Sequence, residues 1–588
     1  MFAMKTKEII ERAMAQIKAD LILRGGKYVN VFTRELLDGD IVVSGSKIVH
    51  IGLQTSEFEG ENTEILNVTG KIISPGLIES HIHVESSKLT LTEFTKAVIT
   101  HGTTAAVIDP HELANVTGIK GLNVLFDEVR KQKIRYFVEA PSCVPSLPGF
   151  ETSGSVITAA DIEDLMGRDE IFALAEMMNY PGVFLGFDDV IKKIDAAKKS
   201  KKIIEGHAPL LSGKELQTYI ASGIASDHEA SSLEEALEKL RLGMKLQVRE
   251  GSFARDLVNI MTKLKKYNID TRNILISSDD RNPIDLQQKG HLDYTYRLLI
   301  NAGINPLEAI QMLTINPATH LNVNDQIGSL GPGKNADIVV VDNLEEFKVE
   351  LVFVNGELVA KDGKTNFLQE EMNYPSFILD TVSNLQIPDI EDLQIIRKEV
   401  DQVKVKVISL NENSLITDHL NHTLIVENDK VVPDVENDVL PIVVVNRHTD
   451  EQRIGKGFVK GLGIKEGAIA STIAHDCHQL ICVGTNYQSM LKAISKIKDT
   501  KGGQVVVFKD KITVLPLEFA GIMSCLSFEE VVSKTQQLHA SLLDLETSIS
   551  EPFMALAFVS LPVIPHLKIT DYGLVDVDTM TKVSVFED

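Results

Sequence analysis

Eight short β-rich runs between residues 72 and 330 constrain the fold of this chain more than any other feature. Helix-like stretches such as LEEALEKLRLG and SFARDLVNIMTKLKKY lie between most of them. Parallel strands need long crossover connections, so this alternation is typical of a (β/α)₈ barrel. We therefore predict an α/β fold with a TIM-like barrel. The runs are KIISPGLIES, TTAAVID, IRYFVEA, IFALAEM, KIIEGHA, GIASDH, MKLQVRE and RNILISSDD.

The flanking segments have different patterns. Residues 1–71 begin with a helix-like amphipathic stretch and continue as short alternating strands broken by Gly-Gly, Asp-Gly-Asp and Ser-Gly. A related pattern returns within residues 331–385. We predict that these two segments form one small β-sandwich, with the barrel of residues 72–330 inserted between them. Residues 390–588 mix strands with helices and are predicted to form a separate α+β domain.

Composition excludes several classes of protein. The net charge of −24 would repel DNA and RNA, so a small neutral molecule is a better candidate partner than a nucleic acid. No window approaches the ~18 consecutive apolar residues of a membrane span. The N-terminus lacks the pattern of a secretory signal, so we expect a cytoplasmic protein without membrane association. The four cysteines form no CxxC pair, which argues against a thiolate zinc site.

Several strand runs end in side chains that bind metals. His81 and His83 close the first run, and alternate residues of a strand face the same side, so both imidazoles can reach one cation. A His-x-His pair taken alone is equally consistent with two histidines on the protein surface. Nitrogen and oxygen donors also close later runs, a set that suits Fe²⁺, Mn²⁺ or Zn²⁺. In barrels the chemistry lies at this end of the strands. These later residues are Glu176, His207, His228 and Asp279.

The segments PGLIESHIHVESS, EMMNYPG, EGHAP, SDHE and SSDD resemble the amidohydrolase superfamily, and within it the bacterial adenine deaminases. The resemblance continues through IAHDCHQLICVG near the C-terminus. It implies two divalent cations, with Mn²⁺ or Fe²⁺ favoured and Zn²⁺ left open. Many relatives bridge the cations with a carboxylated lysine, but here Glu176 occupies that position. The implied metal ligands are His81, His83, Glu176, His207, His228 and Asp279.

The resemblance also implies an activity, the hydrolytic deamination of adenine to hypoxanthine and ammonia in purine salvage. Two cations would lower the pKa of a shared water. Asp279 is the candidate that accepts the proton of this water and returns it to the departing amine. Asp279, Glu176 and His228 form the predicted catalytic set, and a homo-oligomer, specifically a dimer, is expected.

Four residues are candidates for contacting the purine ring. Glu85 lies two residues beyond His83 and shares its face if the strand continues. Dihydroorotases carry an arginine at the matching place, whereas an acid suits the N–H groups of a neutral purine. Pro110 biases the preceding residue away from helical angles, so the loop after the second strand turns there. The other candidates are Asp109, His111 and Glu112, and a solvated loop charge is the competing interpretation for each.

Two other functions remain open. One is another amidohydrolase reaction, such as hydrolysis of a cyclic amide, and the other is a non-catalytic binding protein with this fold. His475 and His478 are spaced to share a helix face. They could form a third metal site, although a lid over the pocket, a domain contact or plain core packing explains them more simply.

Overall fold

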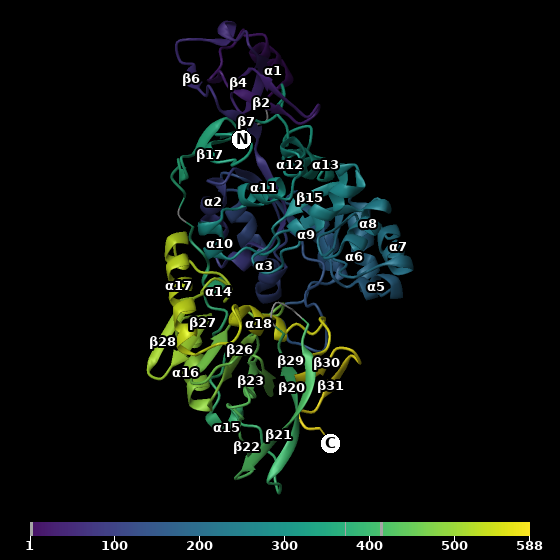
Figure 1. Ribbon diagram of the computed structural model, residues 1–588, viewed down its shortest axis with the longest axis vertical. Coiled ribbons are helices and arrows are strands. Elements are labelled where there is room, and N and C mark those ends of the chain that lie inside the picture. Colours follow the sequence, from purple (N-terminus) through teal and green to yellow (C-terminus); the bar gives the residue numbers. More distant parts are fainter. Residues whose placement is uncertain (1–3, 371, 412–415, 588) are drawn as a thin grey trace.

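The computed structural model describes residues 4–370, 372–411 and 416–587. Three parts follow one another along its longest axis (Figure 1). A β-rich part lies at one end, a part with parallel strands and helices lies in the middle, and a mixed domain formed by the C-terminal third lies at the other end. The N-terminal helix α1 (Thr6–Ala13) belongs to the first part.

The middle part contains eight parallel strands. They form one five-stranded sheet in the order β12-β11-β10-β9-β8 and one three-stranded sheet in the order β13-β14-β15. The strands are β8 (Leu77–Ile82), β9 (Thr103–Ile108), β10 (Arg135–Ala140), β11 (Ile171–Met177), β12 (Ile203–Gly206), β13 (Ser226–Asp227), β14 (Lys245–Arg249) and β15 (Ile274–Ser277).

Backbone hydrogen bonds join the two curled sheets at both seams. Between β12 and β13, the N–H of Ala225 donates to the carbonyl of Ile204 at 2.9 Å. Between β15 and β8, the N–H of Asp279 donates to the carbonyl of His81, and the N–H of His83 donates to the carbonyl of Asp279, each at 3.0 Å. The eight strands therefore close into a ring, which confirms the predicted barrel.

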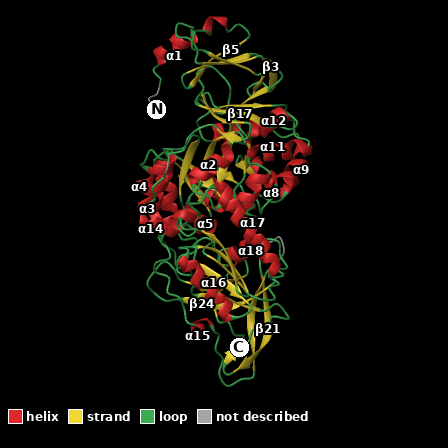
Figure 2. Ribbon diagram, turned by 90° about the vertical axis from the view of Figure 1, so that its left-hand side faces the viewer, coloured by secondary structure: helices red, strands yellow, loops and turns green. Residues whose placement is uncertain are grey.

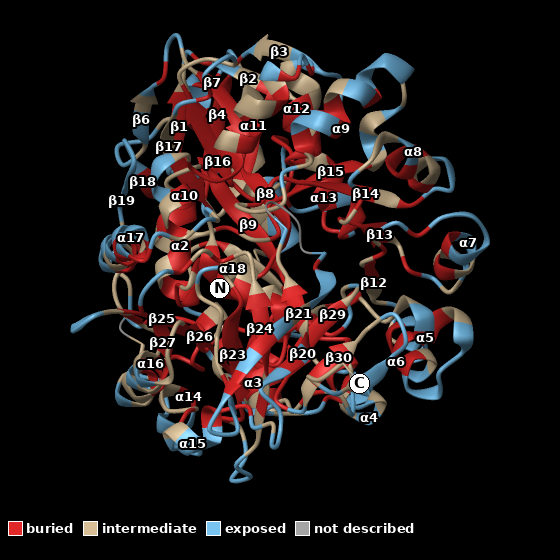
Figure 3. Ribbon diagram, turned by 60° about the horizontal axis from the view of Figure 1, so that its bottom comes forward, coloured by how far each residue is buried: buried red, intermediate tan, exposed pale blue. Residues whose placement is uncertain are grey.

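Helices surround these strands, and the strands themselves are buried (Figures 2 and 3). Strands covered on both faces read as continuous apolar runs, as TTAAVI does in β9. The helices are α2 (Leu91–Ile99), α3 (His111–Val129), α4 (Ala159–Met166), α5 (Tyr180–Leu185), α6 (Asp188–Lys199), α7 (Gly213–Ala221), α8 (Leu233–Arg241), α9 (Leu257–Leu264), α10 (Pro283–Gln288), α11 (Leu292–Asn301), α12 (Pro306–Met312) and α13 (Ile315–His320).

The first predicted barrel run is in fact two strands that meet at Gly76. The first of them, β7 (Ile72–Pro75), pairs with β16 (Ile338–Val341) in the small β-rich part, and only β8 belongs to the barrel. A Cβ on Gly76 would lie 2.1 Å from Oγ1 of Thr104, so a larger residue at this crossing would force the buried Thr104 side chain to move. The barrel therefore begins at Leu77 and not at residue 72.

The small β-rich part has two sheets whose buried apolar residues share one core, as predicted for a sandwich. Strands from both ends of the barrel insertion share the seven-stranded sheet, in the order β19-β18-β17-β16-β7-β2-β3. The four-stranded sheet has the order β5-β4-β1-β6. The remaining strands are β1 (Leu21–Arg24), β2 (Lys27–Asn30), β3 (Glu35–Asp38), β4 (Asp40–Ser44), β5 (Lys47–Gly52), β6 (Glu64–Asn67), β17 (Val349–Val354), β18 (Glu357–Lys361) and β19 (Lys364–Thr365).

The C-terminal part is an α+β domain, also as predicted. Its nine-stranded sheet runs β22-β21-β20-β24-β23-β26-β25-β27-β28, and β29-β30-β31 forms a smaller sheet. The strands are β20 (Gln402–Ser409), β21 (Asp418–Glu427), β22 (Lys430–Val431), β23 (Leu440–Val445), β24 (Ile454–Lys460), β25 (Ala468–Ser471), β26 (Leu480–Gly484), β27 (Gly503–Phe508), β28 (Lys511–Pro516), β29 (Leu567–Thr570), β30 (Gly573–Asp576) and β31 (Thr581–Val583).

This domain docks on the barrel beside the C-terminal end of β8. The N–H of Ser524 donates to the carbonyl of Lys88 at 2.9 Å, and the N–H of Phe528 donates to the Glu93 carboxylate at 3.0 Å. The domain therefore covers the edge of the barrel where strand-end chemistry is expected. Its helices, with those of the preceding connection, are α14 (Ser376–Leu379), α15 (Ile390–Leu393), α16 (Tyr487–Asp499), α17 (Phe528–Asp544) and α18 (Pro552–Val559).

Candidate active site

The six predicted metal ligands converge at the C-terminal ends of the barrel strands. His81 lies in β8 and His83 directly follows it, while Asp279 lies opposite both across the closing seam. The backbone φ of Asp279 is 58°, in the left-handed region that few residues other than glycine adopt. The two seam hydrogen bonds hold this backbone, so the carboxylate is fixed beside both imidazoles.

Glu176 lies near the end of β11. One oxygen of its carboxylate faces His83, and the other faces His207 and His228. Its Oε1 lies 3.4 Å from Nε2 of His83. Its Oε2 lies 2.6 Å from Nδ1 of His207 and 3.1 Å from Nε2 of His228. A carboxylate in this position can contact two cations at once, which is the geometry of a bridging ligand.

The spacing of the cluster fits a bound cation better than direct hydrogen bonds. Oδ1 of Asp279 lies 3.3 Å from Nε2 of His83 and 3.6 Å from Nε2 of His81. Two ligands at ordinary bond lengths around one tetrahedral cation are about 3.4 Å apart. Nε2 of His81 is buried and has no hydrogen-bond partner among the described residues. The residues thus fit a divalent cation, which would supply the missing partner.

The charges of the cluster favour ionised carboxylates. Burial would raise the pKa of Glu176, but His207 and His228 outweigh it and hold that pKa well below its usual value. The same balance holds for the pKa of Asp279, where burial is opposed by the nearby His81 and His83 and by the charge of Arg249. Both acids are therefore anionic at neutral pH, as metal ligands must be.

Asp109 and His111 lie within this cluster. The carbonyl of Asp109 is 3.0 Å from Nδ1 of His83, which places the ring hydrogen on Nδ1 and leaves the Nε2 lone pair toward Glu176. The Asp109 carboxylate is 3.1 Å from Nδ1 of His111, and that nitrogen is 3.6 Å from Oε1 of Glu176. The sequence predicted both as ring contacts, but the structure places them among the candidate metal ligands and not among the residues that line the pocket.

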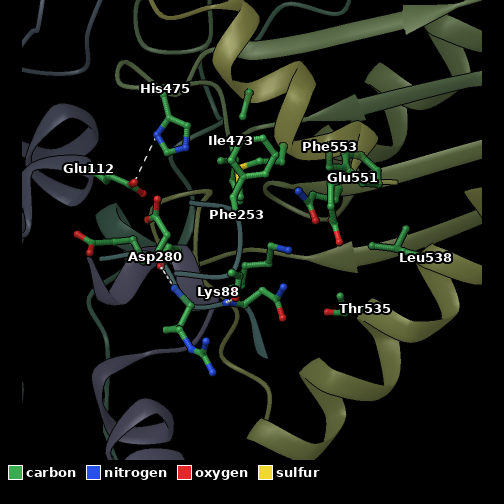
Figure 4. Close-up of a pocket in the computed structure, with 18 of the residues that line it drawn as sticks. Lys88, Glu112, Phe253, Asp280, Ile473, His475, Thr535, Leu538, Glu551 and Phe553 are labelled. Carbon is green, nitrogen blue, oxygen red and sulfur yellow. Dashed lines mark hydrogen bonds and ion pairs between the residues drawn. The ribbon is translucent and has the colours of Figure 1, made fainter. Parts of the chain in front are cut away.

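A cleft between the barrel and the C-terminal domain has Asp280, the residue after Asp279, in its lining (Figure 4). Its empty space is about 850 Å³, part of which is open to solvent. Glu85 and Glu112 line it, as the sequence predicted for ring-contacting residues. Its other walls combine six apolar residues with polar and charged ones such as Lys88, Arg281 and Glu551. A concave site that joins apolar walls to polar groups suits a small molecule. The apolar lining residues are Phe253, Ile473, Leu538, Phe553, Met554 and Ala557.

Two residues of this region were not singled out from the sequence, and a third, His475, was considered there as part of a lid over the pocket. Asp280 lines the cleft, and burial together with the charge of Asp279 raises its pKa to about 7. Arg249, at the end of β14, contacts the carboxylate of Asp279. His475 of the C-terminal domain also lines the cleft. Asp280 ends a predicted strand run and Arg249 is the second-last residue of another, and this position was the available signal.

His475 and His478 do not share a helix face, because they lie in a turn between β25 and β26. Nε2 of His478 lies 3.6 Å from Oε2 of Glu112, and Nδ1 of His475 lies 3.4 Å from Oε1. The N–H of Ala474 donates to Nδ1 of His478 at 3.4 Å, so the hydrogen of the neutral ring is on Nε2. Nε2 of His478 is buried and has no hydrogen-bond partner among the described residues, and the side chains of Glu112, His475 and His478 join the barrel to the C-terminal domain.

The chain was compared with known proteins. The amidohydrolase family model matches residues 72–359, and the model of the adenine deaminase C-terminal domain matches residues 414–581. An adenine deaminase from Methanococcoides burtonii is 39% identical over 100% of this chain and 99% of its own. Those from Desulfatibacillum aliphaticivorans and Methanothrix thermoacetophila are 37% and 38% identical, over 99% of this chain and 99% and 100% of theirs.

The barrel and the cluster of histidines and carboxylates at its strand ends are those of a metal-dependent hydrolase of the amidohydrolase type. The similarity to adenine deaminases extends over essentially the full length of the chain, including the domain that covers the barrel. The chain belongs to the adenine deaminase family. Within the described ranges, no helix combines the length and apolar character needed to span a bilayer.

Proposed function

We propose that this chain hydrolyses adenine to hypoxanthine and ammonia. The observation that carries the proposal is the full-length similarity to adenine deaminases, combined with a carboxylate, Glu176, where many amidohydrolases bridge with a modified lysine. Hydrolysis of a cyclic amide is the weaker alternative, because the relatives named above are all deaminases. A purely non-catalytic protein is disfavoured because every predicted ligand is present and clustered.

We assign two cations to the cluster and favour Mn²⁺ or Fe²⁺, with Zn²⁺ as the alternative. Bound cations would supply Lewis acidity and lower the pKa of a shared water, so that hydroxide is available near pH 7. His81, His83 and Asp279 lie on one side of the cluster. His207 and His228 lie on the other side, and Glu176 lies between the two groups. The complete set is His81, His83, Glu176, His207, His228 and Asp279.

The reaction adds water at C6, breaks the bond from C6 to the exocyclic nitrogen and releases ammonia. Asp279 accepts a proton from the attacking water and returns it to the departing amine. Glu176 and His228 complete the catalytic set by holding the centre. Asp109 and His111 support it, since the Asp109 carbonyl orients His83.

The ring must also gain a proton at N1. Glu85 is our candidate donor, because burial raises its pKa and it faces the cleft. It regains a proton from the C6 hydroxyl when that group becomes the carbonyl of hypoxanthine. Its Oε1 accepts a hydrogen bond from the N–H of Leu113 at 3.1 Å, which fixes the side chain. Glu112 lines the same cleft and completes the group proposed to bind substrate.

The test is product analysis with the protein loaded with Mn²⁺ or Fe²⁺. Adenine should give hypoxanthine and ammonia in equal amounts, whereas dihydroorotate should not be opened. If dihydroorotate is opened and adenine is left intact, the cyclic-amide alternative replaces this proposal. If neither reacts although the metals are bound, the protein is not a catalyst of this class.

We further propose a cytoplasmic homodimer and a four-part division of the chain. The division follows the predicted segments 1–71, 72–330, 331–385 and 390–588, with the first boundary moved to Gly76. Light scattering on the purified protein tests the dimer, and limited proteolysis tests the connection before residue 390.

A further inference from the structure

His475 enters the substrate cleft from the C-terminal domain, and its position is fixed on several sides. Its backbone N–H donates to the carbonyl of Ala557 at 3.1 Å. Its ring stacks on Phe558 with centroids 4.5 Å apart and an angle of 25° between the planes. Nδ1 lies 3.4 Å from Oε1 of Glu112 on the barrel. A side chain held this way presents a rigid edge to a ligand.

The remaining ring nitrogen, Nε2, is on the edge directed away from Glu112 (Figure 4). No side chain or backbone group in the described part of the protein forms a hydrogen bond with it. Nε2 is not fully enclosed by protein atoms, and His475 lines the cleft. Nε2 is therefore a free hydrogen-bonding position beside the substrate cleft.

The shape of the substrate determines which of its atoms can reach Nε2 of His475. Hydrolysis requires C6 to lie at the metal-binding cluster on the barrel. Purine is flat and rigid, so its five-membered ring then extends away from the barrel strands. The opposite wall of the cleft is built by the C-terminal domain, including Ile473, His475 and Phe553.

We propose that His475 positions the substrate by a hydrogen bond from Nε2 to the five-membered ring of the purine. This inference rests on the proposed adenine deaminase function. It gives the C-terminal domain a direct part in substrate recognition, because the ligand cluster lies wholly on the barrel. Glu112 links the two sides, since its other oxygen faces His478 at 3.6 Å.

The test compares His475→Ala with the wild type, both loaded with Mn²⁺, using adenine and two analogues. In 9-methyladenine the N–H of the five-membered ring is lost, and in 7-deazaadenine the N7 acceptor is lost. With adenine, we expect His475→Ala to raise KM about 3- to 10-fold, with a smaller change in kcat and an unchanged metal content. His475→Gln, which places an amide near the position of Nε2, should recover part of the loss.

The comparison between substrates separates positioning from a general structural defect. The wild type should discriminate against at least one analogue, and His475→Ala should lose that discrimination. His422→Ala is the matched control, because this histidine lies on β21 and pairs with Asp434 away from the cleft. It should leave all three substrates unaffected.

Two negative results have different meanings. If the wild type turns over adenine and His475→Ala keeps the same ratios among the three substrates, the inference about His475 is wrong and the proposed function stands. If the metal-loaded wild type releases no ammonia from adenine, the proposed function fails, and this inference fails with it.

Discussion

The guanidinium of Arg249 lies 2.9 Å from Oδ2 of Asp279, while the other oxygen of that carboxylate faces His81 and His83. Arg249 also contacts Glu229, and its side chain is almost completely buried. The carboxylate is thereby held with one oxygen toward the cluster and one toward a fixed cation. This arrangement sets the orientation of the proposed proton acceptor.

Arg249→Met should reduce kcat about 10- to 100-fold, because a hydrogen bond between charged groups is worth about 1.5–3 kcal/mol. The loss should be larger in kcat than in KM, since Arg249 is not part of the lining of the cleft. Steady-state kinetics with metal-loaded protein provide the measurement. Arg272→Met, at an exposed arginine paired with Asp270, is the control and should behave as the wild type.

Asp279→Asn should remove turnover while retaining most of the metal. Asparagine keeps the shape and one oxygen ligand but cannot accept and return a proton at neutral pH. Metal analysis and ammonia release should be measured on the same sample. Activity close to that of the wild type would show that another group, with Asp280 the nearest candidate, moves the proton.

Glu176→Gln should lose metal as well as activity. Each oxygen of Glu176 faces a different set of histidines, and an amide offers only one oxygen acceptor. Even outer-shell partners of metal ligands are worth about 10- to 100-fold in affinity or activity, so we expect a loss of at least about 100-fold. Retention of both cations with full affinity would contradict the bridging role.

Asp293→Asn tests a charged group away from the metal cluster. Burial would raise the pKa of Asp293, but His101 and Arg297 lower it to about 2. At about 1.36 kcal/mol per pKa unit, the ionised group contributes about 2 kcal/mol to stability at neutral pH. Because the folded pKa is below the unfolded value, this contribution is complete above about pH 4 and is lost as the pH falls toward 2.

Urea denaturation at pH 7 and at pH 2.5 measures this contribution. The variant should be less stable than the wild type at pH 7, and the difference should shrink at pH 2.5. Asp127→Asn, at an exposed helix position paired with Arg130, should change stability little at either pH. An equal loss at both pH values would assign the effect to lost shape and not to charge.

The barrel and the six residues at its strand ends could be predicted because both follow from local pattern. A buried parallel strand is an apolar run, and the residue after it lies at the functional end, so His83 and Asp279 can be placed without coordinates. The pattern could not divide KIISPGLIES between two sheets. That division depends on the approach of Thr104 to Gly76, which are far apart in sequence.

The contacts that could not be predicted from the sequence depend on the tertiary structure. His475 lies in a turn of another domain and reaches the cleft only because that domain docks beside β8. Asp109 was predicted from its side chain, but its backbone carbonyl makes the contact that orients His83. The helix-face spacing of His475 and His478 was misleading, since no helix forms there.

The most direct test of the central claim is a titration of the metal-free protein with Mn²⁺ while ammonia release from adenine is followed. Activity should rise from near zero and reach a plateau at two cations per chain, and Glu176→Gln should not reach that plateau. Ammonia release that is unaffected by a chelator, or that is complete with one cation per chain, would contradict the two-cation centre bridged by Glu176.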